Sequence, residues 1–255
     1  MILLRSNPYK WWNLLGFIAV IIVNTLANTT VLNGLSTGEI SDKYPTLITP
    51  AGYAFMIWGL IYLLLLGFII YQFRRTTESR ESVQRIGPWF VLSCIFNVAW
   101  LLLWQYLYIE LSVVVMVLLL LSLIMIYVRT RRIHYPTPGE MWLVKLPFSL
   151  YFGWISVATI VNVGVALKKN DWDGFGLSDT AWAVIMLLVG ALLAILVSYP
   201  YRDSIYPLVF VWAYIAIGIN QKDTAENVFI AAFILAAILL IYAIYLFFAR
   251  NRDRD

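Results

Sequence analysis

Eight long apolar segments follow one another along the chain, and they limit its fold more than any other feature. A helix needs about 20 apolar residues to cross the hydrocarbon core of a bilayer. Lipid offers no partner to backbone N–H and C=O groups, so a spanning segment must bond its own backbone as a helix. The sequence therefore predicts an all-α, polytopic membrane helix bundle with eight spans. They are expected at Trp11–Leu32, Pro50–Phe73, Pro88–Tyr108, Leu111–Val128, Glu140–Leu167, Thr180–Tyr199, Ile205–Ile219 and Val228–Ala249.

The composition agrees with a membrane protein. Hydrophobic residues make up 62% of the 255 positions and charged residues 13%, whereas soluble domains have about 45–50% and about 25%. The basic residues lie in loops between spans, where orientation in the membrane explains them, so the net charge of +4 does not indicate nucleic-acid binding. We expect the lipid bilayer to be the main partner.

The distribution of Lys and Arg predicts the orientation. Of the 18 Lys and Arg residues, all but four lie on the side of the N-terminus; the four are Lys43, Lys168, Lys169 and Lys222. Cytoplasmic loops carry the excess of basic residues, so we expect both termini in the cytoplasm of a bacterial cell, with the protein in its plasma membrane. The loop Asn33–Thr49 would then be extracytoplasmic. The same count favours a full crossing by the short segment Ile205–Ile219.

The few reactive side chains exclude several functional classes. Cys94 and His134 are the only residues of their types, which rules out a His/Cys metal cluster and argues against a Ser-His-Asp arrangement. No charge lies near the middle of a span, which disfavours an ion-driven pump. The last three spans hold no lysine for a retinal Schiff base, and no glycine-rich phosphate loop is present. We therefore predict no metal site and no catalytic residue.

Aromatic and amide side chains recur at helical spacing inside three spans. Residues three and four apart share one face of a helix. The candidate ligand-binding residues are Phe55, Trp58 and Tyr62 in the second span, Asn97, Trp100 and Trp104 in the third, and Trp154, Ala158 and Asn162 in the fifth. Buried indoles and amides need hydrogen-bond partners. We infer that these three spans face one another around a cavity for an apolar small-molecule ligand.

The alternative is that these residues only hold the bundle together. Asn24 and Asn28 in the first span show the same ambiguity, because they lie on one helix face and in lipid their amides are expected to face a neighbouring helix. Tryptophans near span ends, Trp172 and Trp182 among them, fit the usual interfacial belt.

Three motifs resemble those of the TspO/MBR family, the tryptophan-rich sensory or translocator proteins. They are Pro45, Pro50, Trp58 and Tyr62 at P-x4-P-x7-W-x3-Y spacing, Asn97-Val98-Ala99-Trp100, and the run from Trp154 to Asn162. They occur in the family's order on the second, third and fifth spans. The resemblance covers about residues 10–167, so we expect a five-helix unit at 1–167 and a three-helix extension at 168–255.

The resemblance implies an integral membrane protein that binds, senses or transports an apolar planar ligand such as a porphyrin, haem or a sterol. It implies a pocket roofed by the first loop, and the lining carried over is Trp58, Asn97, Trp100, Trp154 and Ala158. Leu47 and Thr49 depart from the family's pattern in that loop, and there we expect ligand preference to differ. No cofactor is expected other than a bound porphyrin or haem.

Two other functions stay open. One is a light-dependent enzyme that degrades porphyrins, which is disfavoured because the chain shows no general acid or base for it. The other is a regulatory or structural membrane partner that docks through the last three spans, where small residues allow close helix contact. A homo-oligomer also stays open, although the third span, which is poor in glycine, offers no clear close-contact face for a dimer.

Overall fold

The computed structural model describes residues 7–74, 76–77, 80–133 and 135–252. Four residues used in the charge count or in the exclusion of histidine catalysis lie outside this part: Arg5, Arg75, His134 and Arg254. Residue contacts divide the chain into two compact units. Unit 1 is Met1–Thr37 with Ile57–Phe152, and unit 2 is Gly38–Met56 with Gly153–Asp255.

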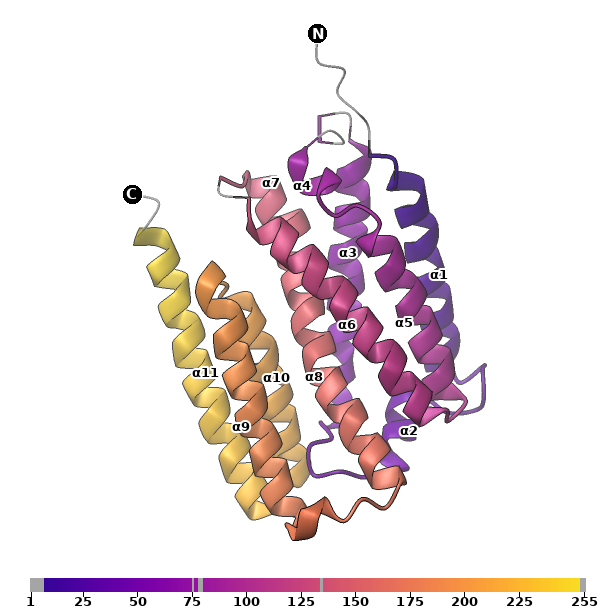
Figure 1. The fold of residues 1–255 in the computed structure, drawn as a ribbon, viewed down its shortest axis with the longest axis vertical. Coiled ribbons are helices and arrows are strands. Elements are labelled where there is room, and N and C mark those ends of the chain that lie inside the picture. Colours follow the sequence, from indigo (N-terminus) through magenta and orange to yellow (C-terminus); the bar gives the residue numbers. More distant parts are fainter. Residues whose placement is uncertain (1–6, 75, 78–79, 134, 253–255) are drawn as a thin grey trace. The chain divides into compact units, whose positions relative to one another are not determined.

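Each of the eight expected spans corresponds to one long helix in the described part (Figure 1). The helices are α1 (Lys10–Asn28), α3 (Ile57–Phe73), α5 (Trp89–Gln105), α6 (Ile109–Arg131), α8 (Leu146–Lys169), α9 (Asp179–Ser198), α10 (Ile205–Gln221) and α11 (Glu226–Arg252). Among the described residues, six helical segments are long and apolar enough to cross a membrane, and α5 and α10 are apolar helices of 17 residues. The prediction of a multi-pass integral membrane helix bundle is confirmed.

Short helices that the sequence did not predict lie in the connections. They are α2 (Thr37–Asp42), α4 (Glu81–Gln84), α7 (Pro138–Glu140), and the 3-10 turns η1 (Gly52–Met56), η3 (Gly174–Gly176) and η4 (Tyr199–Tyr201). The π-helical turn η2 (Met141–Lys145) joins α7 to α8.

The first span is shorter than expected, because α1 ends at Asn28 rather than Leu32. Thr30 has a left-handed backbone with φ 63°. The Val31 N–H then donates to the Leu26 carbonyl (3.1 Å) and the Thr30 N–H to the Ala27 carbonyl (3.3 Å). This is the Schellman pattern, which satisfies carbonyls at the helix end and stops the helix.

The second expected span is interrupted, since α3 begins only at Ile57. The residues before it form the 3-10 turn η1, and this region bonds to α10 within unit 2. The Ala51 N–H donates to the Ala216 carbonyl (3.1 Å), and Trp212 Nε1 donates to the Ala54 carbonyl (3.1 Å). Phe55 therefore lies on the 3-10 turn η1, whereas Trp58 and Tyr62 lie on α3; the sequence had predicted all three on one α-helix.

Unit 1 packs α5 against α1 and α6, with α3 beside α1. Its core contains three rings, Phe68, Phe90 and Phe148, which meet edge to face with centroids 5.1–5.8 Å apart. Edge-to-face pairs stabilise a core beyond the area that they bury.

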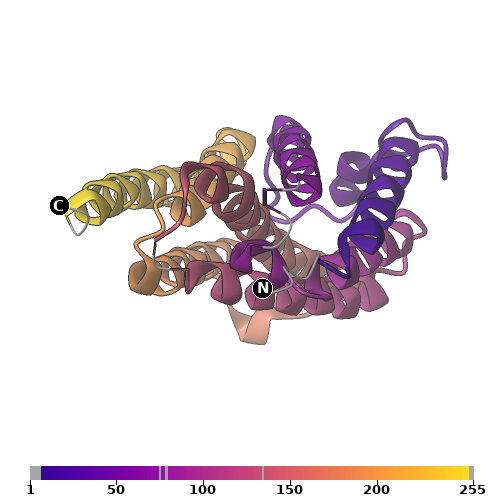
Figure 2. The ribbon, with the colours of Figure 1, turned by 90° about the horizontal axis from the view of Figure 1, so that it is seen from above.

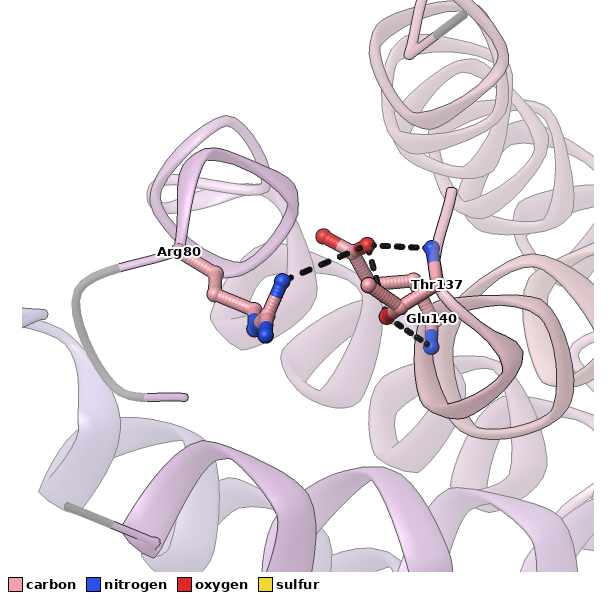
Figure 3. A network of polar contacts seen from close by, with 3 residues as sticks. All are labelled: Arg80, Thr137 and Glu140. Atoms are coloured by element: carbon pink, nitrogen blue, oxygen red, sulfur yellow. Dashed lines mark hydrogen bonds and ion pairs between the residues drawn. The ribbon is translucent and has the colours of Figure 1, made fainter. Parts of the chain in front are cut away.

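A capping box fixes the entrance to α7 and α8 in unit 1 (Figure 3). The Thr137 N–H donates to Glu140 Oε2 (2.8 Å), and the Glu140 N–H donates to Thr137 Oγ1 (3.3 Å). Arg80 Nη1 lies 3.8 Å from Glu140 Oε2. Reciprocal bonds of this kind satisfy free N–H groups at a helix start, and the arginine connects the loop before α5 to this point.

Unit 2 is built around α10, which packs against both α9 and α11. These helices run side by side in Figure 1, and the same helices, orange to yellow, are neighbours in Figure 2. Glycines permit the close contacts: a Cβ on Gly218 would lie 2.6 Å from the Phe233 ring, and one on Gly153 would lie 2.9 Å from Val209 Cγ2. Small residues allow helix backbones to approach closely in membranes.

Candidate ligand-binding site

The candidate residues of unit 1 form a packed aromatic column. Trp58 stacks on Tyr62 (centroids 5.4 Å apart, 21° between planes) and lies 6.5 Å from Trp100. Trp100 in turn stacks on Trp104 at 6.1 Å and 26°. The three indoles are each no more than 8% exposed. The rings therefore contact one another, and the structure brings these candidates together as core.

A chain of buried amides accompanies the column. Asn24 Nδ2 donates to Asn97 Oδ1 (3.0 Å), and Asn97 Nδ2 donates to the Tyr151 hydroxyl (3.0 Å). The expectation that the first span's amides bond a neighbouring helix is confirmed for Asn24 and wrong for Asn28, which is exposed and donates to the Asn24 carbonyl of its own helix (2.9 Å). At the end of the column, Trp104 Nε1 donates to the Thr37 carbonyl (3.2 Å). These polar groups of the candidate residues bind other parts of unit 1.

The other candidates belong to unit 2. The rings of Phe55 and Trp154 meet edge to face at 6.1 Å. Trp154 and Asn162 are buried, and Ala158 is partly exposed. Because the two groups of candidates lie in different compact units, a single cavity shared by the second, third and fifth spans stays a prediction.

Unit 2 contains a cavity of about 180 Å³ beneath the first loop. The loop contributes four consecutive residues, and the walls come from the second half of α8, the following connection and the start of α9. The lining is Pro45, Thr46, Leu47, Ile48, Ile160, Val163, Gly164, Leu167, Lys168, Trp172, Gly174, Asp179, Trp182, Ala183 and Met186. Most of these side chains are apolar, which suits a ligand that partitions into membranes.

Hydrogen bonds hold the loop over this space. Thr46 Oγ1 and Thr49 Oγ1 are 2.9 Å apart, and Asn220 Nδ2 of α10 donates to the Thr49 carbonyl (3.1 Å). A Cβ on Gly164 would lie only 3.1 Å from Ile48 Cδ1. A larger residue at position 164 would therefore occupy the space that the loop and α8 enclose.

The rim of the cavity is polar and aromatic. Lys168 Nζ lies 3.1 Å from Asp179 Oδ2. Trp172 and Trp182 have ring centroids 4.9 Å apart, and Trp182 Nε1 donates to the Gly174 carbonyl (2.6 Å). Gly174 has φ 66°, a conformation that glycine adopts without steric cost, so the connection can fold back onto the Trp182 ring.

None of the nine candidate residues lines this cavity. Trp172 and Trp182, which the sequence placed in the interfacial belt, do line it. Leu47, the departure in the first loop, lines it as well. The available signal was the pair of tryptophans on either side of Gly174, but a tryptophan at an interface and one at a cavity rim have the same sequence pattern.

The described residues contain no group of three or more His, Cys, Asp or Glu side chains that could hold a metal ion. The haem iron is usually bound by His, Cys, Met or Tyr, and Met186 is the one residue of these types in the lining given above. The cavity therefore fits a ligand held by apolar contacts better than one held through iron.

Comparison with known proteins gives one result. The family model described as TSPO-like protein matches residues 10–245. The match includes α9 and α10 and most of α11, so it extends beyond the resemblance seen at residues 10–167; the division at residue 167 stays a prediction. No curated protein matches the chain, and no solved structure matches it.

Proposed function

This chain belongs to the TSPO-like protein family, and from that premise we propose that it binds a small apolar ligand in the cavity beneath Pro45–Ile48. The protein is an integral, multi-pass membrane protein of the TspO type. The observation that carries the proposal is the cavity itself, an apolar space between the first loop and the helices α8 and α9. Binding there would serve sensing or transport of the ligand.

The size of the cavity bears on the ligand. Sites that enclose drug-sized molecules measure about 300–1,000 Å³, and this one measures about 180 Å³. A porphyrin or a sterol would therefore place one edge or one end in it. The indoles of Trp172 and Trp182 at the rim offer apolar faces and would contact the part of the ligand that remains outside.

A cavity-filling substitution tests this proposal. Gly164→Leu places a side chain under Ile48, and Gly59→Leu on α3 is the matched control, because a Cβ at Gly59 meets nothing within 4 Å. Binding of metal-free protoporphyrin and of a sterol is measured on the protein in phosphatidylcholine nanodiscs, with empty nanodiscs subtracted. We expect Gly164→Leu to weaken binding at least about tenfold, a loss of about 1.4 kcal/mol, and Gly59→Leu to leave it unchanged.

A second pair of variants compares this cavity with the aromatic candidates. Trp58→Phe combined with Trp154→Phe alters both groups of candidate residues and leaves the cavity lining intact. If that double variant weakens binding and Gly164→Leu does not, the ligand site is the aromatic one and the cavity is not the site. If neither protoporphyrin nor the sterol binds the unsubstituted protein, the proposed function is wrong for these two ligands.

A further inference from the structure

The cavity continues inward. A smaller space of about 20 Å³ lies deeper in unit 2, lined by Ile48, Val157, Ile160, Val161, Met186, Leu187, Phe210, Tyr214 and Ile217. Three of these residues, Ile48, Ile160 and Met186, also line the outer cavity. Methionine is unbranched and flexible, so it adapts to gaps. The two spaces thus share three apolar side chains, one of which, Met186, can change its conformation easily.

The outer end is different, because both charged residues of the lining are there. Lys168 and Asp179 form an ion pair whose side chains are 50% and 76% exposed. Such exposed pairs contribute little stability, so a ligand can replace them at small cost. A ligand with a single charge would leave one of the two partners without its counter-ion. A ligand head that carries both charges would give each partner a new one.

The two indole rings at the rim also favour a ligand head group that carries a cationic ammonium. Trp172 and Trp182 line the same cavity as Asp179, Trp182 follows Asp179 on α9, and the two ring planes are inclined at 55°. Cationic ammonium groups are attracted to indole faces within about 6 Å, and quaternary ammonium groups are recognised in this way. A cavity lined by a carboxylate and two indoles suits a choline-type ammonium, while Lys168 is a suitable partner for a phosphate.

We propose that the ligand of this cavity is a zwitterionic amphiphile with one hydrocarbon tail: its phosphate meets Lys168, its ammonium group meets Asp179 and the two indoles, and its tail points past Met186. The proposal rests on the proposed function and names the class of ligand for the same site. The tail length that fits depends on whether Met186 leaves the inner space open.

A head-group series tests the charge assignment. Four probes share one chain length: lysophosphatidylcholine, a lysophosphatidic acid, an alkyltrimethylammonium and a monoacylglycerol. Binding is measured on the full chain in nanodiscs, with empty nanodiscs subtracted. We expect lysophosphatidylcholine to bind about tenfold more tightly than the neutral monoacylglycerol, and each singly charged probe to lie between them.

Substitutions of the two charged residues at the rim should then change which head groups the cavity prefers. Lys168→Met should weaken the binding of lysophosphatidylcholine and lysophosphatidic acid about fivefold and leave that of the alkyltrimethylammonium unchanged. Asp179→Asn should weaken the binding of lysophosphatidylcholine and the alkyltrimethylammonium about fivefold and leave that of lysophosphatidic acid unchanged. Lys222→Met is the control, since Lys222 is an exposed lysine of the same unit outside both cavities. The double variant Lys168→Met with Asp179→Asn should bind lysophosphatidic acid and the monoacylglycerol alike, because only the two indoles, which favour an ammonium group, remain. Equal binding of the four probes by the unsubstituted protein overturns the proposal.

The tail is tested by chain length. Each buried methylene should tighten binding about fourfold until the cavity is full. Met186→Ala opens the way to the inner space, so the affinity should go on rising with longer tails, whereas Leu188→Ala, at an exposed position on the same helix, should not change the limit. An unchanged limit in Met186→Ala overturns the position of the tail.

The variant Gly164→Leu distinguishes failure of the proposed ligand class from failure of the proposed function. If the four probes bind equally and Gly164→Leu abolishes their binding, the cavity is the site but its ligand is not zwitterionic. If Gly164→Leu changes the binding of no probe, neither the proposed function nor the ligand class holds for this cavity.

Discussion

The buried amide chain of unit 1 permits a quantitative test of how the bundle is held together. Asn97 accepts from Asn24 Nδ2 and donates to the Tyr151 hydroxyl, both at 3.0 Å, and its side chain is fully buried. The perturbation is Asn97→Ala, which removes both hydrogen bonds and adds no new group.

The expected magnitude follows from the number of bonds lost. An interhelical hydrogen bond in a membrane protein contributes about 0.6 kcal/mol on average and up to about 1.7 kcal/mol. Losing two should therefore lower the free energy of unfolding by about 1–3 kcal/mol. The control is Asn28→Ala, because the Asn28 amide donates to the Asn24 carbonyl of its own helix (2.9 Å). That change should cost less than about 0.5 kcal/mol.

A double-mutant cycle that combines Asn97→Ala with Tyr151→Phe measures the interaction energy between these two side chains. The free energy of unfolding is measured in bicelles for the unsubstituted protein, both single variants and the double variant. We expect a coupling energy of about 0.5–1.5 kcal/mol between positions 97 and 151. Additive effects, or an Asn97→Ala variant no less stable than Asn28→Ala, would show that the amide chain does not stabilise unit 1.

Three further predictions concern packing, capping and orientation. Gly153→Ala should destabilise unit 2 by about 1–3 kcal/mol, because its Cβ would lie 2.9 Å from an α10 side chain. Gly59→Ala, with open space around it, should raise the free energy of unfolding by up to about 1 kcal/mol. Thermal unfolding of both variants checks this. Glu140→Gln should lower stability by about 1 kcal/mol through the loss of the charged partner in the capping box, and equal melting temperatures of variant and parent would contradict it. If both termini are cytoplasmic, a maleimide that does not cross membranes should label Lys222→Cys from outside intact cells and leave Arg132→Cys unlabelled; both positions are exposed and the native Cys94 is buried, so the reverse pattern would invert the proposed orientation.

Some features of the site follow directly from residue type and spacing. Asn24 was expected to face another helix because an amide in lipid has few alternatives, and it bonds Asn97. Trp58 and Tyr62, four residues apart, lie on one face of α3 and stack. The sequence could not place Phe55, since its segment bonds to α10, and a partner so distant along the chain leaves no local pattern.

By itself, the sequence determined that this protein is a bundle of membrane helices and where each helix lies along the chain. The reason is physical: bilayer thickness sets the length of an apolar segment, and the absence of water makes that segment a helix. Only the tertiary structure decided where space remains between the helices. Three of the indoles predicted to wall a pocket, Trp58, Trp100 and Trp104, pack on one another in unit 1, while a cavity lies between Leu47, Gly164 and Met186 in unit 2. A cavity depends on which side chains fail to fill a gap, and that is a property of three-dimensional packing.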